Sequence, residues 1–296
     1  MRNYKIITDS TCDLPGPLAR DLGIHIIPMS FVLDGESHLH DPLNREFSPS
    51  SFYEILAQGK SSTTSMINMA VFREHFTQYL NQGLDLLYLS FSSQLSGSCN
   101  AARLAMEELK EEYPDRKLIL VDTRAASIGQ GLLVKTAAEK QQEGFSLEDL
   151  TAWATTHRDK VCHWFTVEDL QHLKRGGRIG AVTANVGTAL NIKPVLRVDH
   201  AGALITHSRV MGRKKSLLEL IERMKKDAEN PKDQKIIIGH GNALKDAEFV
   251  ASKVREEIGV EDILITPIGP VIGSHTGPGI IGLVFMGLKD ETERSS

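Results

Sequence analysis

Short apolar runs alternate with helix-like segments through the first half of the chain, and this alternation most constrains the fold. Expected strands are residues 5–8, 24–33, 84–90 and 117–122, and expected helices begin near residues 13, 48, 68, 101 and 130. We expect Asp13 to cap the first helix, with Pro15 in its first turn. Strands that alternate with helices favour a parallel sheet covered on both faces.

The pattern changes after about residue 160. The expected elements there are strand 161–167, helix 168–174, a hairpin of 193–198 with 203–210, helix 215–226, strand 235–238 and helix 244–258. This order indicates a mixed sheet with helices. We therefore predict a two-domain α/β fold, with an N-terminal parallel-sheet, Rossmann-like domain over residues 1–158. A C-terminal mixed-sheet α/β domain is expected over residues 159–296.

Length and composition narrow the class of protein. The 296 residues are enough for two domains with separate cores, and the formal net charge of −4 argues against a nucleic-acid surface. No apolar run approaches the roughly 20 residues of a membrane span, and no signal peptide is evident. The 3 cysteines are odd in number and widely spaced, so we expect reduced thiols in a cytoplasmic protein.

Glycine and proline crowd the segment Ile268–Gly279, which also carries Ser274, His275 and Thr276. Because glycine raises the entropy cost of ordering and proline removes a donor, we expect a shaped loop and no helix. Apolar runs on both sides predict that the loop joins two strands. A loop that presents an imidazole and hydroxyls is a candidate binding site.

Two hydroxyl-rich segments are the other main candidates. Residues 90–98 follow an expected parallel strand, and residues 61–65 precede an expected helix. Ligands of open α/β sheets bind at the carboxyl ends of strands, where loops and helix N-termini accept anions. Simple helix capping explains any single serine equally well, but two clusters favour an oxyanion or carboxylate site.

Cations and histidines give weaker signals. The block 173–180 puts Arg175 and Arg178 beside glycines, which suits a phosphate or carboxylate but also an ordinary helix end. Residues 37–41 resemble half of a metal site, yet nothing completes it, so we expect a solvated loop, no metal and no cofactor. The loops typical of ATP, dinucleotide and α/β-hydrolase sites are absent from the sequence.

Six blocks together resemble the DegV family in order and spacing. They are residues 7–15, 64–65, 92–98, 121–123, 173–179 and 269–279, and the resemblance covers essentially the whole chain. It implies a two-domain α/β protein that binds a long-chain fatty acid in a tunnel, with the carboxylate at the domain interface. Such proteins serve as the non-catalytic, acyl-carrying subunit of a bacterial fatty acid kinase, and this role is compatible with peripheral membrane contact.

The resemblance also implies a set of binding residues. Thr64, Ser92 and Ser93 are expected at the carboxylate, with His275 and an arginine of the 173–179 block, taken as Arg175, near the head group. Ser65 and Thr276, next to two of these, complete the set.

Two positions depart from the family pattern. Met66-Ile67 stands where Gln-Pro is usual, and Met211 stands where an arginine is expected.

Two rival functions remain open at this point. A serine hydrolase of lipid esters would use Ser92 or Ser93 with His275 as base, although no elbow motif or third group supports it. A nucleotide or phosphosugar enzyme would use the glycine-rich segment and Arg175, but the phosphate-loop motifs are missing.

Overall fold

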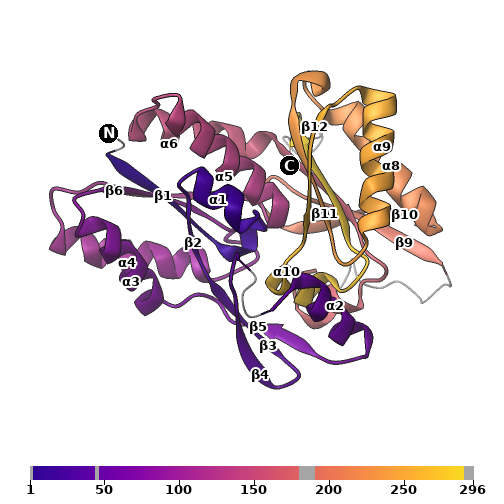
Figure 1. Cartoon of the computed structure of the whole chain (residues 1–296), viewed down its shortest axis with the longest axis horizontal. Coiled ribbons are helices and arrows are strands. Elements are labelled where there is room, and N and C mark those ends of the chain that lie inside the picture. The colour runs from indigo at the N-terminus through magenta and orange to yellow at the C-terminus, as the bar shows by residue number, and fades with distance from the viewer. Residues whose placement is uncertain (1–2, 44–46, 180–190, 290–296) are drawn as a thin grey trace.

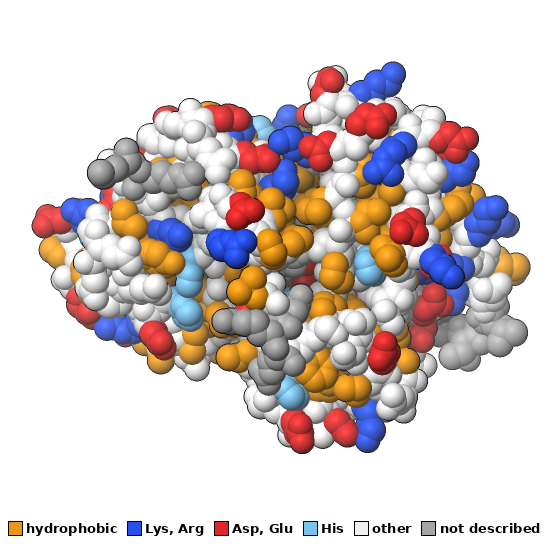
Figure 2. Space-filling model, viewed as in Figure 1, with side chains coloured by type: hydrophobic (Ala, Val, Ile, Leu, Met, Phe, Trp, Pro, Cys, Tyr) orange, Lys and Arg blue, Asp and Glu red, His pale blue; other side chains and the backbone are white. Residues whose placement is uncertain are grey.

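The computed structural model describes residues 3–43, 47–179 and 191–289. Two large sheets lie side by side, with a small third sheet below them in Figure 1. On the face seen in Figure 2, hydrophobic side chains gather towards the centre of the molecule, and charged side chains are spread over the rest of the face. Among the described residues, no helix is long and apolar enough to cross a membrane.

The N-terminal sheet has four parallel strands, as the alternating sequence pattern predicts. Their spatial order is β2 (His25–Ile27), β1 (Tyr4–Asp9), β6 (Asp85–Ser90) and β7 (Leu118–Asp122). One apolar cluster joins this sheet to α3 (Met69–Leu80) and α4 (Ser98–Glu112). A second cluster joins it to α1 (Gly16–Asp21), α5 (Ser127–Gln142) and α6 (Leu147–His157). Both faces of the sheet are therefore covered.

The C-terminal sheet is mixed, which confirms the expected fold class. Its order is β10 (Leu204–Met211), β9 (Ile192–Val198), β8 (Val161–Thr166), β13 (Ile281–Met286), β11 (Lys235–His240) and β12 (Asp262–Pro267). Only the β11–β12 pair is parallel, and β9 and β10 form the expected hairpin. Helices α8 (Arg213–Asp227) and α9 (Leu244–Ile258) cover one face of this sheet.

Helix α5 lies between the two large sheets. It contacts β6 on one side and β8, β11 and β13 on the other. Its first eight residues, 127–134, are all buried, so this part of the helix is buried around its whole circumference. One core cluster consequently runs from Leu87 of the N-terminal sheet through Leu133 to Val284 of the C-terminal sheet.

A small antiparallel sheet corrects two expectations. Its order is β4 (Glu36–His40), β3 (Met29–Leu33) and β5 (Ser62–Thr64), with helix α2 (Pro49–Ala57) nearby. Residues 37–41, expected as a solvated loop, thus lie mostly in β4, because a turn at Asp34-Gly35 with positive φ at both residues folds the chain back. The hydroxyl-rich segment 61–65 lies mostly in the edge strand β5, which pairs with β3 and is not part of the parallel sheet.

The expected loop in the glycine-rich segment is wrong in part, because Pro270–Thr276 forms the short helix α10. Pro270 occupies the first turn, where its missing N–H costs nothing, and Gly277 ends the helix at φ 75°. The expected cap at Asp13 is also wrong. Asp13 follows the 3₁₀ turn η1 (Ser10–Cys12) at φ 51°, and Pro15 precedes α1.

The remaining described elements are short. They are α7 (Gln171–Arg175) and the 3₁₀ turns η2 (Arg158–Lys160) and η3 (Pro231–Asp233). Gly180, the last residue of the arginine block, lies outside the described residues.

Candidate functional site

An apolar pocket lies where the loops after the N-terminal strands meet β8 and α10. About 60 Å³ of it is wide enough for a water-sized sphere. Its apolar lining is Met29, Phe91, Leu95, Ala126, Phe165, Leu173, Leu204, Ile268, Val271, Ile272 and Ile280. Its polar lining is Thr11, Thr64, Ser96, Ser127, His163, Arg178, His275 and Thr276. A mostly apolar pocket with a few polar side chains suits an amphipathic ligand.

Three polar side chains from distant segments form the head-group cluster, which we define as Thr64, Arg178 and His275. Thr64 Oγ1 lies 2.8 Å from His275 Nε2, although 211 positions separate the two residues. The Arg178 guanidinium donates from Nε to the Leu95 carbonyl (3.2 Å) and from Nη1 to the Gly176 carbonyl (2.5 Å). These two bonds hold the guanidinium at the pocket. The Thr64 hydroxyl and the His275 imidazole lie beside it, so an anion there would meet one cation and two neutral hydrogen-bonding groups.

His275 is neutral at physiological pH. Burial, and to a lesser extent the charge of Arg178, lowers its pKa to about 4. Its Nδ1 is buried without a hydrogen-bond partner among the described residues, close to the Gly176 backbone. A Cβ on Gly176 would lie 2.2 Å from that nitrogen, so only glycine leaves room for the ring.

Asp13 fixes the helix that carries His275. The amide N–H of Gly269, the residue before α10, donates to Asp13 Oδ1 at 2.9 Å, and Ser127 Oγ donates to Oδ2 at 2.5 Å. Burial raises the pKa of Asp13 to about 7, and both donors oppose that rise. A further contact of 2.7 Å joins Ser274 Oγ to Ser62 Oγ on β5. Helix α10, which lies between β12 and β13 in the chain, is thereby held against the N-terminal half of the fold.

The structure brings some of the expected binding residues together. Thr64, His275 and Thr276 line the pocket, although the Thr276 hydroxyl donates to the Ile272 carbonyl at 3.1 Å. Arg175 is exposed, with Nη2 3.1 Å from His172 Nδ1. It lines an outer pocket of about 220 Å³ that shares the head-group cluster with the apolar pocket. Ser65 is exposed and lines neither pocket.

Ser92 and Ser93 are not brought to this pocket. Ser92 Oγ is buried and donates to the Gly202 carbonyl at 2.7 Å, and the Ser93 side chain is exposed. Ser96, from the same hydroxyl-rich segment, lines the pocket instead. Arg178 lines the apolar pocket, whereas Arg175 does not. The sequence signal that could have pointed to Arg178 is the apolar residue next to it, Ile179, which is 6% exposed in the structure.

Catalytic geometry is not evident among the described residues. His275 Nε2 pairs with Thr64, and no serine or carboxylate is hydrogen-bonded to its ring. A nucleophile–base pair oriented by a third group is therefore not formed at His275. The described residues also contain no group of three or more metal-ligating side chains.

Fold and pocket together define a two-part α/β protein with an apolar pocket and a cationic, hydroxyl-bearing head-group cluster. The model of the DegV family, "Uncharacterised protein, DegV family", matches residues 3–287, and the chain belongs to this family. A DegV domain-containing protein of Clostridium perfringens is 44% identical over 287 residues, which are 97% of this chain and 98% of the relative.

Solved structures of the family share the fold. A DegV family protein of Thermus thermophilus, described as fatty acid binding, has a TM-score of 0.87 and 33% identity over 97% of this chain and 100% of its own. DegV of Bacillus subtilis, described as a fatty acid binding protein, has a TM-score of 0.83 and 26% identity over 97% of this chain and 100% of its own. A lipid-binding DegV protein of Thermotoga maritima has a TM-score of 0.86 and 29% identity, with 98% of this chain and 100% of its own covered.

Proposed function

We propose that this protein binds one long-chain fatty acid, with the acyl chain in the apolar pocket and the carboxylate at the head-group cluster. The single observation that carries the proposal is the junction of Thr64, Arg178 and His275 with a pocket lined mainly by apolar side chains. Family members with the same fold are described as fatty acid binding, which supports this ligand class.

The energetics require both parts of the site. About fifteen methylenes at about 0.8 kcal/mol each give a gross burial gain near 12 kcal/mol. Association and ordering costs of about 4–15 kcal/mol offset much of this gain. A carboxylate buried without partners would cost several more kcal/mol, so the head-group cluster decides whether net binding is favourable.

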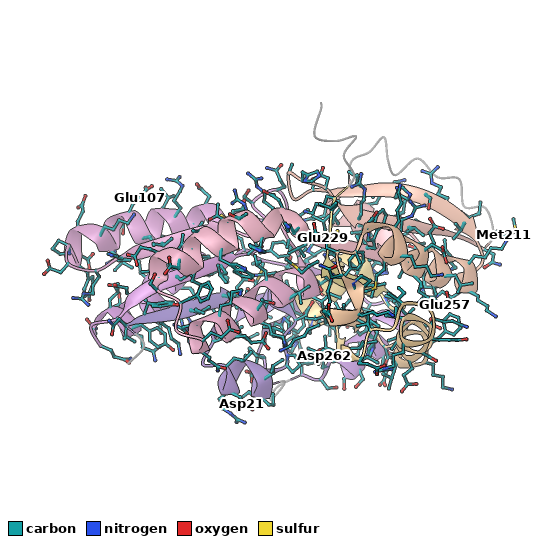
Figure 3. All side chains as sticks on the ribbon, turned by 90° about the horizontal axis from the view of Figure 1, so that it is seen from above. Asp21, Glu107, Met211, Glu229, Glu257 and Asp262 are labelled. Atoms are coloured by element: carbon teal, nitrogen blue, oxygen red, sulfur yellow. The ribbon has the colours of Figure 1, made fainter. Side chains whose placement is uncertain are left out.

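In this proposal the protein is a carrier and not an enzyme, and it presents the carboxylate to a separate kinase in the cytoplasm. All three members of the head-group cluster also line the outer pocket, which offers a route to the carboxylate from outside. Met211, at the position where the resemblance implies an arginine, is 66% exposed at the outer end of β10 (Figure 3). Kinase docking here would therefore lack a cation at that position.

Native mass spectrometry of protein purified from a bacterial host tests the binding proposal. We expect a stoichiometric, non-covalent fatty acid that solvent extraction releases, and rebinding of palmitate or oleate by the delipidated protein. The proposal fails if repeated extractions return no lipid and added fatty acids do not bind.

The substitution His275→Ala separates the carrier from the rival serine hydrolase. A carrier keeps most of its lipid affinity, since Arg178 and Thr64 remain, but loses much of its acyl-phosphate formation when a cognate kinase and ATP are supplied. Ser92→Ala, outside the pocket, is the matched control and should keep both properties. Ester hydrolysis by the wild type that disappears with His275→Ala, together with a fluorophosphonate adduct, would establish the hydrolase instead.

A further inference from the structure

His163 is a polar side chain in the apolar pocket that the proposed carboxylate site does not use. It lies in the middle of β8, is 6% exposed and lines the pocket. Phe165, two residues along the strand, lines the same pocket, and the two ring centroids are 5.7 Å apart. Alternation along the strand places both rings on the pocket face of β8.

Neither ring nitrogen of His163 has a hydrogen-bond partner among the described residues. Nδ1 is fully buried and unpaired beside Gly129 of α5, where a Cβ would approach it to 2.9 Å. Nε2 lies 3.7 Å from the position of a Cβ on Gly282. Burial lowers the pKa of this histidine to about 3, and the nearby positive charge of Lys289 acts in the same direction. The imidazole is therefore neutral, with one donor and one acceptor.

A buried polar group without a hydrogen-bond partner destabilises a fold. A phenylalanine or leucine would fill most of this space without that cost. Gly129 makes room for the ring, because a Cβ there would lie 2.9 Å from Nδ1, so the surroundings on this side fit the imidazole closely. A ligand hydroxyl at Nε2, the ring nitrogen that is not fully buried, would give the imidazole one hydrogen-bond partner.

Ser127 provides a second polar group in the same pocket. Its hydroxyl donates to Asp13, which leaves lone pairs on Oγ as acceptors. Thr11, the other hydroxyl from this side of the pocket, is already engaged, with Oγ1 2.8 Å from Gln130 Oε1 and bonded to Asp9. His163 and Ser127 come from β8 and α5, elements that contribute nothing to the head-group cluster.

We propose that His163 selects fatty acids that carry a hydroxyl group on the acyl chain, with Ser127 as a second hydrogen-bonding partner. This inference rests on the proposed fatty-acid-binding function and names a subclass of its ligand. A chain hydroxyl offers one donor and two acceptor positions, so it satisfies the neutral imidazole in either tautomer. In a wholly apolar pocket the same hydroxyl would be desolvated without compensation.

Competitive binding by the delipidated protein tests the inference, using stearate and hydroxystearates substituted at carbons 3, 7, 10 and 12. The measured quantity is the affinity of each hydroxystearate relative to stearate. We expect His163→Leu to lower this ratio by tenfold or more for at least one isomer, with stearate affinity kept. His163→Gln, which keeps a donor and an acceptor, should restore part of the ratio. Phe165→Leu reshapes the same pocket without changing its hydrogen bonding and should alter the ratio less than threefold.

A nitrogen NMR measurement on the wild type gives a readout that does not depend on folding of a variant. The ring nitrogens of His163 should shift with the hydroxystearate that binds best and not with stearate. The inference is overturned if the ratio changes less than tenfold for every isomer, or if both ligands give the same histidine spectrum. If the wild type binds neither stearate nor any hydroxystearate, the proposed function itself fails.

Discussion

Replacing Arg178 by methionine removes the only cation at physiological pH among the described residues that line the apolar pocket. His275 stays neutral there, so the variant leaves a bound carboxylate with uncharged donors only. Methionine keeps much of the apolar stem and avoids a large cavity.

The size of the effect follows from burial. Truncating one partner of a buried, hydrogen-bonded charge pair costs about 2–5 kcal/mol. Arg178 is only partly buried, so the lower part of this range applies, about 2–3 kcal/mol. Since 1.4 kcal/mol is a factor of ten, the dissociation constant for palmitate should rise about 30- to 150-fold.

Isothermal titration of delipidated protein with palmitate measures this change. Arg175→Met is the matched control, because Arg175 is exposed and lines only the outer pocket. Its effect should stay below threefold. Methyl palmitate provides a second control, since its affinity should be nearly the same in the wild type and in Arg178→Met.

Two results would refute this reasoning. Palmitate affinity within threefold of the wild type in Arg178→Met would place the carboxylate elsewhere. An equal loss of affinity for palmitate and methyl palmitate would mean that the arginine acts by holding the Leu95 and Gly176 carbonyls and not through its charge.

Three further outcomes are expected. Ser96→Ala should weaken palmitate binding by about 1–2 kcal/mol, whereas the exposed Ser93→Ala should change it less than twofold in the same titration. Gly176→Ala should displace the His275 ring and reduce acyl-phosphate formation as His275→Ala does, with most of the lipid affinity kept, whereas Gly177→Ala, with nothing within 4 Å, should cost only about 1–2 kcal/mol of stability from its φ of 68°. The pKa of His275 is near 4 in the folded state and 6.5 in the unfolded state. Its contribution to the free energy of unfolding should therefore be complete above pH 6.5 and be lost as the pH falls towards 4, which denaturation at several pH values measures. The wild type should therefore lose stability faster than His275→Gln in that window, by up to about 1.4 kcal/mol per pH unit, and equal slopes would contradict the assignment.

The sequence predicted most of the fold because its strands and helices have clear boundaries. Asn68 and Ser48 cap helices where expected, and the alternation of elements predicted the parallel sheet. Helix α10 was missed because residues 268–279 contain four glycines and two prolines, whose low helix propensity argues against a helix. Tertiary bonds from Asp13 and Ser62 stabilise it, and these partners are more than 200 residues away.

The residues that line the pocket were harder to predict than the segments that carry them. Each expected segment reaches the pocket, but which of Ser92, Ser93 and Ser96 faces it depends on the path of the loop after β6. The same holds for Arg175 and Arg178, which stand on opposite sides of a turn at Gly176-Gly177. His163 could not be found at all, because a histidine within an apolar strand looks like any other buried residue.

The position of helix α5 has a consequence for cooperativity. Because its side chains complete the cores of both large sheets, neither half can lose its structure without exposing the apolar surface of this helix. Heat or denaturant should therefore melt the two halves in one transition, and residues 1–158 expressed alone should aggregate. Amide hydrogens of β6 and β13 should exchange through the same global opening, and a ligand at the pocket should slow both together.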